Sequence, residues 1–319
     1  MAPSGKGPGG GRFRDAWIGQ VVQALGLGGV PTFHPRVQVT PEEIQKLRRA
    51  GRTYWEGGWG AGRSARFNKY DAQRRRFVAR HGEGAEALEQ RVFHEESVEY
   101  EFGQYAQRHG IEDPEAFKRE LADRLRRLWA DKKVAIRIDK RSLELILADR
   151  RYRTIHEENE QDIRGFGLIS GKERGFYEEF LWGYDEDSDP EIRPVYGYLV
   201  GAGNDEAVEK YGDIQLVLKD SVRPRTTAMY GDSLDHMSYG MPSAVDNPGW
   251  QSWTFGTGTD DQDELFELDR THLTGDIYVE AQIHGGVQLR DIERIVFPYE
   301  PPTATQRLLR AKRIPWSVE

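Results

Sequence analysis

The sequence has no cysteine among its 319 residues. This absence excludes disulfide bonds, thiolate nucleophiles and cysteine-ligated metal sites. A long apolar run is also missing. Because no stretch of about 18 apolar residues occurs, no membrane span is predicted. The glycine-rich start of the chain lacks the apolar core of a signal peptide, so Sec-type secretion is not expected.

Several short catalytic motifs are absent as well. The sequence contains no P-loop, no HExxH zinc motif and no GxSxG nucleophile elbow, and no GxGxxG pattern follows a predicted strand as a dinucleotide site requires. The histidines at positions 236, 272 and 284 do not have the spacing of metal ligands, so we predict no metal site. These absences leave function to be argued from single polar residues and their order in the chain.

Charge is present in abundance but is unevenly distributed. Residues 1–153 hold 30 Lys and Arg against 21 Asp and Glu, whereas residues 154–319 hold 15 against 32. The chain as a whole has a net charge of −8. A basic front half and an acidic back half indicate two different environments, and the basic half suits an acidic partner.

Hydrophobic spacing predicts an α+β protein with two parts. Residues 1–131 read as a helical, basic docking region with a disordered glycine-rich start, and residues 132–319 as an α+β domain. Helices are expected over residues 17–27, 40–50, 85–108, 114–129, 142–149 and 172–182. Strands are expected over residues 134–138, 193–201 and 213–220. A capping box at Thr40 and Glu43, and the pair Asp113-Pro114, mark two of the helix starts.

Aromatic and basic residues are interleaved between positions 50 and 80. Trp55 and Trp59 lie among glycines and are followed by seven Lys or Arg residues. This composition is typical of a nucleic-acid surface, although no base-reading motif occurs. The alternative interpretation is a solvated face or one that docks on a protein partner.

The stretch from Asp276 to Pro298 is the one around which the acidic half is organised. It opens with an extended run, in which successive side chains point to opposite faces of a strand. One face is expected to carry Tyr278, Glu280, Gln282 and His284. The other face is expected to enter a core with Val279, Ala281 and Ile283. Four different hydrogen-bonding side chains in a row are typical of a cleft wall, whereas the alternative is an edge strand with a solvated face.

Three blocks in the acidic half resemble, in their order, the ADP-ribosyltransferase fold. Arg193 begins the strand RPVYGYL, the pair Thr226-Thr227 precedes Ser233, and Glu280 lies on the late strand. The resemblance implies a split β-sheet that binds NAD, with Arg193 holding the phosphates, because a guanidinium clamps a diphosphate bidentately. It also implies that Thr226, Thr227 and Ser233 support the nicotinamide pocket. Glu280 would stabilise the oxocarbenium-like ribosyl transition state.

The same resemblance implies ring-stacking partners for the nicotinamide, for which Tyr196, Tyr230 and Tyr278 are candidates. The sequence departs from the family at one point. Many members carry Glu or Gln, then any residue, then the catalytic Glu, and a strict overlay would place Gln282 at the catalytic position. The DNA-modifying branch instead has one Glu followed by an apolar strand, as in EAQIHGGVQLRDI. We therefore predict that Glu280 is the acid and include Gln282 in the catalytic group.

A second resemblance covers about residues 132–319. The blocks RPVYGYL, YGDIQLVLKDSVRPRTT, GDSL and YVEAQIHGGV resemble a segment of minor head proteins from actinobacterial tailed phages. In those proteins the segment is associated with a Mu gpF-like domain and resembles an ADP-ribosyltransferase. The resemblance implies a virion protein with phage head or portal proteins as partners.

Together these resemblances predict a head-associated phage protein that transfers ADP-ribose from NAD to a macromolecule. Two alternatives stay open, namely a catalytically inactive structural protein of the head or portal vertex, and a toxin effector of bacterial conflict. Nucleic acid is a further expected partner, through residues 50–80. The expected location is the virion head or the host cytoplasm.

Overall fold

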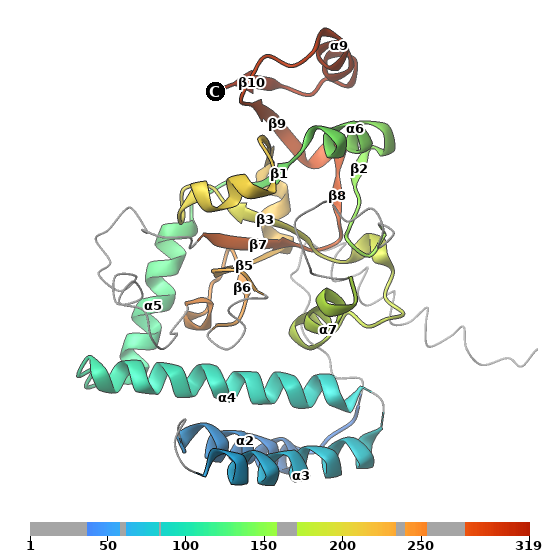
Figure 1. The fold of residues 1–319 in the computed structure, drawn as a ribbon. Coiled ribbons are helices and arrows are strands. Elements are labelled where there is room, and N and C mark those ends of the chain that lie inside the picture. The colour runs from blue at the N-terminus through green and yellow to red at the C-terminus, as the bar shows by residue number, and fades with distance from the viewer. Residues whose placement is uncertain (1–36, 58–61, 83, 158–170, 234–239, 254–277) are drawn as a thin grey trace, which may run out of the picture.

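The computed structural model describes residues 37–57, 62–82, 84–157, 171–233, 240–253 and 278–319 (Figure 1). Four helices come first in these ranges, namely α2 (Pro41–Glu56), α3 (Arg63–His81), α4 (Ala85–Arg108) and α5 (Pro114–Trp129). A mixed sheet follows them, which confirms the predicted α+β class with a helical N-terminal half. The helix expected over residues 17–27 lies outside the described residues, and the division at residue 131 stays a prediction.

The predicted helix starts are confirmed by their caps. The Thr40 side chain accepts a hydrogen bond from the Glu43 amide, and the Glu43 carboxylate accepts one from the Thr40 amide. Asp113 accepts from the Ala116 amide at 2.9 Å. Helix α2 continues to Glu56, beyond the expected end near residue 50, because its later turns are buried against other helices, as at Tyr54.

The sheet joins strands that are far apart in the sequence. In the described part of the chain its order is β10-β9-β4-β1-β3-β7-β5-β6. The strands are β1 (Val134–Ile138), β3 (Val195–Leu199), β4 (Ile214–Leu218), β5 (Thr226–Tyr230), β6 (Ser243–Ala244), β7 (Val279–Ile283), β9 (Ile292–Phe297) and β10 (Trp316–Val318). Neighbours are antiparallel except β10 and β9, which are parallel. A separate ribbon pairs β2 (Arg151–Tyr152) with β8 (Val287–Gln288).

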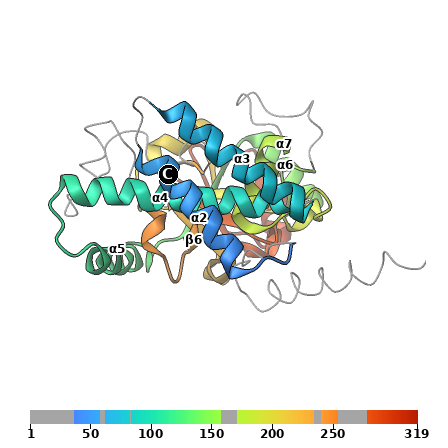
Figure 2. The same ribbon diagram turned by 90° about the horizontal axis from the view of Figure 1, so that it is seen from below.

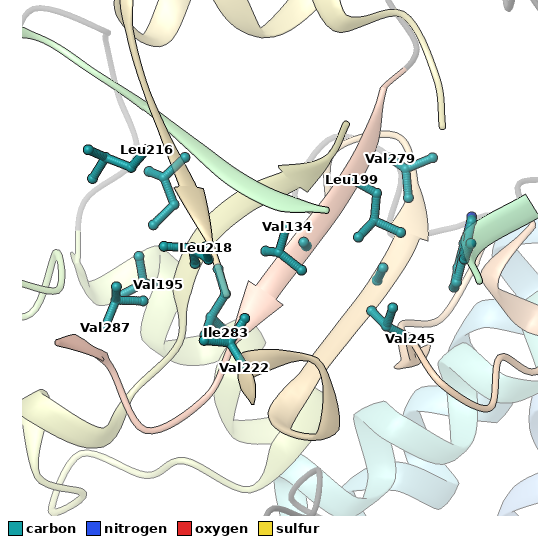
Figure 3. Close-up of a cluster of buried hydrophobic side chains, with 14 of the residues drawn as sticks. Val134, Val195, Leu199, Leu216, Leu218, Val222, Val245, Val279, Ile283 and Val287 are labelled. Atoms are coloured by element: carbon teal, nitrogen blue, oxygen red, sulfur yellow. The ribbon is translucent and has the colours of Figure 1, made fainter. Parts of the chain in front are cut away.

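One face of this sheet carries the main apolar core. Alternate residues of the central strands point into it, among them Val134, Val195, Leu199, Leu216, Val279 and Ile283 (Figure 3). Helix α6 (Lys140–Asp149), α5 and the end of α4 supply the opposing side chains, including Leu143, Leu125, Trp129 and Phe102. The helical half and the sheet therefore share one core rather than meeting at a polar boundary.

The opposite face of the sheet lies toward helix α7 (Gly171–Trp182), which is drawn below β3 and β7 in Figure 1. Helix α7 packs in turn on α4 through Phe180, Leu181 and Trp182. The long helix α4 thus separates α7 from the layer formed by α2 and α3 (Figure 1). Helix α9 (Thr303–Lys312) lies at the other end of the molecule, beyond β9.

Candidate functional site

Strand β7 divides its side chains between the two faces as the alternation predicts. Val279, Ala281 and Ile283 enter the apolar core. Tyr278, Glu280, Gln282 and His284 point the other way and are at most 5% exposed. These four polar side chains are therefore buried, and the alternative of an edge strand with a solvated face is wrong.

The register of the neighbouring strands decides which residues meet this polar row. Gln282 pairs with Tyr196 on one side and with Thr227 on the other. Directly paired residues of an antiparallel sheet point to the same face, so these three side chains lie together. We call this region the polar face. It consists of the buried polar side chains on this side of β3, β5 and β7, together with the polar side chains of α7 and its flanking loops that contact them.

A continuous chain of hydrogen bonds runs along the polar face. Tyr184 Oη lies 3.1 Å from His284 Nδ1, and His284 Nε2 lies 3.0 Å from Thr227 Oγ1. Thr227 Oγ1 donates to Gln282 Oε1 at 2.7 Å, and Gln282 Nε2 donates to Glu280 Oε1 at 2.7 Å. The chain therefore ends at a carboxylate.

The direction of every bond in this chain follows from its middle. The single hydroxyl proton of Thr227 goes to the carboxamide oxygen of Gln282, which can only accept. Thr227 must then accept from His284, so Nε2 of His284 carries the proton and Nδ1 accepts from Tyr184. Burial, together with the charge of Arg225, lowers the pKa of His284 to about 3, consistent with a neutral ring. All the donors point toward Glu280.

Glu280 is the carboxylate at the end of the chain, and it is 2% exposed. Its Oε1 also lies 3.4 Å from the Ser233 amide nitrogen, which donates to it. Burial, and then the nearby charge of Asp232, raise the pKa of Glu280 to about 7, although Arg174 and the two hydrogen bonds oppose that shift. A carboxyl group with such a pKa exchanges its proton near neutral pH, as an acid or base in an active site must.

Helix α7 contributes a cation and an anion to the polar face. Arg174 donates to Ser233 Oγ at 3.0 Å, and its guanidinium carbon lies 3.9 Å from the centre of the Tyr196 ring. Glu178, four residues later, accepts from Tyr196 Oη at 2.8 Å and from Arg193 Nη1 at 2.8 Å. Arg193 also donates to the Asp185 carbonyl.

The structure brings together most of the side chains selected from the sequence. Glu280, Gln282, Thr227 and Ser233 are linked by direct hydrogen bonds. Glu178 joins Tyr196 to Arg193, and Tyr196 lies beside Gln282 in the sheet. Tyr278 lies at the margin, where its hydroxyl donates to Asp232 at 3.3 Å.

Thr226 and Tyr230 are not part of this group, because they point to the opposite face of β5. Thr226 Oγ1 donates to the Val222 carbonyl at 2.8 Å. The ring of Tyr230 stacks on Trp253, with centroids 4.7 Å apart. Since strand residues alternate, the register of β5 on β7 selects Thr227 and excludes its neighbour.

Sequence reasoning missed the two charged residues of α7, Arg174 and Glu178. Charged residues on a helix usually face water, so they gave no reason for selection. Their spacing of four residues places them on the same side of the helix, which was the available signal. His284 was expected on this face but had no assigned role.

The basic stretch from residue 50 to residue 80 forms the end of α2 and most of α3. Several of its cations are neutralised within the molecule, because α4 carries six Glu residues. Arg52 pairs with Glu96 at 3.1 Å, and Arg74 pairs with Glu89 at 3.0 Å. Part of the basic composition therefore serves helix packing, and the rest faces outward.

Comparison with known proteins finds two similar mycobacteriophage proteins. The chain is 32% identical over 139 residues to the Gene 2 protein of Mycobacterium phage L5, covering 40% of this chain and 54% of that protein. It is 30% identical over 160 residues to the Gene 2 protein of Mycobacterium phage D29, covering 46% of this chain and 59% of that protein. The chain thus spans somewhat more than half the length of these curated relatives. No protein-family model matches it. In the described part, no helix is long and apolar enough to cross a membrane.

Proposed function

We propose that this is a head-associated phage protein whose sheet domain transfers ADP-ribose from NAD to a macromolecule. Similarity to two mycobacteriophage proteins supports the phage assignment. The order of Arg193, Thr227 and Glu280 in the sequence, and their gathering on one side of the sheet, support the transferase assignment. Fold and order alone would be weak support, because one fold hosts many functions.

The observation that carries the proposal is the orientation of Glu280. Four side chains arranged in series deliver a hydrogen bond to its carboxylate, and the Ser233 amide lies close to the same oxygen. Such a network costs stability unless it is fully satisfied, so a protein that needed this face for packing alone would be better served by apolar residues. A carboxylate that these hydrogen bonds hold in place, and whose pKa is near 7, suits chemistry at neutral pH.

In the proposed reaction the bond between C1′ of the ribose and the nicotinamide nitrogen breaks. Its electron pair goes to the nicotinamide, which leaves uncharged, and an acceptor nucleophile forms the new bond to C1′ and loses its proton. The ionised carboxylate of Glu280 would stabilise the positive charge that develops on the ribose. The Arg174 guanidinium is stacked on the Tyr196 ring. In this proposal the two side chains supply a cation and an aromatic ring for the rest of the dinucleotide.

The proposal gives different roles to the two candidates for the acid, and their hydrogen bonds support this division. Gln282 accepts a hydrogen bond from Thr227 through its carboxamide oxygen and donates one to Glu280 through its amide nitrogen. A neutral amide also supplies no negative charge at the ribose. Glu280 is therefore the catalytic carboxylate in this proposal, and Gln282 is the residue that positions it.

A second candidate function is a structural protein of the head or portal vertex without catalysis. The arrangement of Arg193 favours it, since this guanidinium is 4% exposed and is bound by Glu178 and the Asp185 carbonyl. An arginine committed to an internal ion pair does not clamp a diphosphate. In the transferase proposal, the cation for the phosphates must therefore come from elsewhere, and Arg174, which donates to Ser233 beside Glu280, is the candidate.

The two candidates separate in one set of measurements. The purified chain is incubated with labelled NAD and host lysate, and NAD-dependent change in melting temperature is followed in parallel. A transferase gives label on an acceptor and a melting shift, and Glu280→Gln removes the label but keeps the shift. Glu144→Gln, an exposed acid on α6, is the control and should retain both. If the wild-type chain gives neither label nor shift, the structural candidate stands.

Association with the head is tested on particles. Mass spectrometry of purified virions should find the chain in a fixed ratio to the portal protein. Its absence from particles that retain infectivity would contradict the head assignment while leaving the transferase assignment intact.

A further inference from the structure

Helices α2 and α3 form the outermost layer on the side of the molecule away from the sheet (Figures 1 and 2). They pack on α4 and on each other through a small apolar cluster, which includes Leu47, Phe77, Leu88 and Val92. Helix α3 carries seven Lys or Arg residues against one acid, Asp71. The layer is thus held by a few apolar contacts and is strongly basic.

The cations of this layer fall into an inner and an outer group. The inner group faces α4 and is neutralised there. Arg48 contacts Glu95 and Glu96, and Arg74 contacts Glu86 and Glu89. These pairs fix the layer on α4 and leave the inner arginines less available to a partner.

The members of the outer group are exposed and form no ion pair with α4 among the described residues. We call it the outer basic face, and it consists of Lys46, Arg49, Lys69, Arg76 and Arg80. Among the residues that the structure describes, Lys46, Arg49, Lys69 and Arg76 form no ion pair. Arg80 contacts Glu43 at 3.0 Å, yet its side chain is 70% exposed.

The outer basic face has a regular spacing. Arg76 follows Lys69 by seven residues, and Arg80 follows Arg76 by four, so the three lie on one side of α3. At a rise of about 1.5 Å per residue they span roughly 16 Å, which is about five base pairs of duplex rise. Lys46 and Arg49 extend the charge onto the neighbouring helix α2. The face therefore offers a row of cations with the length of a short run of phosphates.

The composition of this face favours nucleic acid over a protein partner. Protein interfaces have an apolar centre and are depleted in Lys, whereas protein–DNA interfaces are polar and strongly positive. In the described parts of α2 and α3, Phe67 is the large apolar side chain that is clearly exposed, at 49%. We propose that the outer basic face binds the phosphate backbone of duplex DNA without reading its sequence.

The test is fluorescence anisotropy with a labelled 30-base-pair duplex of arbitrary sequence, measured from 50 to 200 mM salt. If all five cations contact phosphates, the affinity should fall by roughly several-hundred-fold over that range, because each neutralised phosphate adds about −0.9 to the logarithmic salt slope. The quadruple variant Lys46→Glu, Arg49→Glu, Lys69→Glu and Arg76→Glu should lose binding at every salt concentration.

A matched control keeps the net charge of the variant but moves the changes elsewhere. The substitutions Arg119→Glu, Arg127→Glu, Arg307→Glu and Arg310→Glu alter four exposed cations on α5 and α9. This control should bind DNA much more tightly than the variant, and circular dichroism should show both folded. Equal loss in the two would show that overall charge matters rather than this face, and would overturn the proposal.

Two other outcomes also overturn it. The first is an unaltered chain that fails to bind the duplex at 50 mM salt. The second is self-association, seen by sedimentation velocity, that disappears in the variant while DNA binding does not change. That result would assign the outer basic face to the acidic half of a second copy of the chain.

Discussion

Replacing Thr227 by valine tests the hydrogen-bond chain that ends at Glu280. Valine has nearly the same shape and suits a strand equally well, so the change removes the hydroxyl and little else. In the wild-type chain this hydroxyl donates to Gln282 and accepts from His284, at 2.7 and 3.0 Å. Both partners are fully buried, so the variant leaves a carboxamide oxygen and a ring N–H without a partner.

The expected cost follows from those two groups. Each buried polar group left unpaired costs about 1–3 kcal/mol, so Thr227→Val, which leaves two, should lower the free energy of unfolding by about 2–6 kcal/mol. Thr226→Val is the matched control, because this neighbour is equally buried and its hydroxyl makes one hydrogen bond, to the Val222 carbonyl. The control takes its partner from one group instead of two and should cost about 1–3 kcal/mol, about half as much.

Urea unfolding of the two variants measures the difference, and Thr227→Ser, which keeps a hydroxyl, should recover most of the loss. The pKa of Glu280, followed by carbon-13 NMR of its carboxyl group, should rise further in Thr227→Val, since the amide that donates to the carboxylate loses its anchor. Equal costs for Thr226→Val and Thr227→Val, together with an unchanged Glu280 pKa, would refute the hydrogen-bond chain that ends at Glu280. Neither readout depends on whether NAD binds.

Three further predictions concern the same fold. The pKa of Glu280 is raised to about 7 in the folded state, so its protonated form stabilises the fold below its unfolded pKa near 4.5, and that contribution is lost as pH rises toward 7. Relative to Glu280→Gln, the wild-type chain should therefore lose about 1–3 kcal/mol between pH 5 and pH 8 in urea unfolding, and a flat difference would contradict the burial argument. Arg193→Met should cost about 3–5 kcal/mol because it removes the guanidinium that pairs with the buried Glu178, which keeps Tyr196 and His156 as partners, and adding Glu178→Gln should recover part of this; a loss below 1 kcal/mol would show that the pair is unimportant. Gly197→Ala should destabilise the sheet, since its new Cβ would lie 2.3 Å from the Ala135 carbonyl oxygen, and a melting temperature within a degree of wild type would be inconsistent with the register of β1 on β3.

Local patterns in the sequence predicted the helix starts and the two faces of β7. These features depend on residues within a few positions of one another, such as the capping pair of Thr40 and Glu43. Helix α3 was not predicted from the run of arginines, because its start at Gly62 has no side-chain cap and a left-handed backbone. The arginines on the inner side of α3 could be understood as part of a packed helix once α4 was known to carry their partners.

The candidate site could be predicted in part. Glu280 and Gln282 follow from alternation within one strand, but the choice between Thr226 and Thr227 depends on the register of β5 on β7. That pairing joins residues more than fifty positions apart, and the sequence of neither strand alone specifies it. The role of Arg174 and Glu178 likewise depends on how α7 lies over the sheet, which no local pattern specifies.

Helix α4 carries side chains that join the helices packed on its two sides. Glu95 contacts Arg48 of α2 and also Arg91, whose Nη1 donates to the carbonyls of Phe180 and Leu181 at the end of α7. Three side chains, those of Arg48, Glu95 and Arg91, therefore connect α2 with the end of α7 along the surface of α4. The basic layer and the helix that carries Arg174 are thus joined by ion pairs and hydrogen bonds, in addition to their apolar contacts with α4.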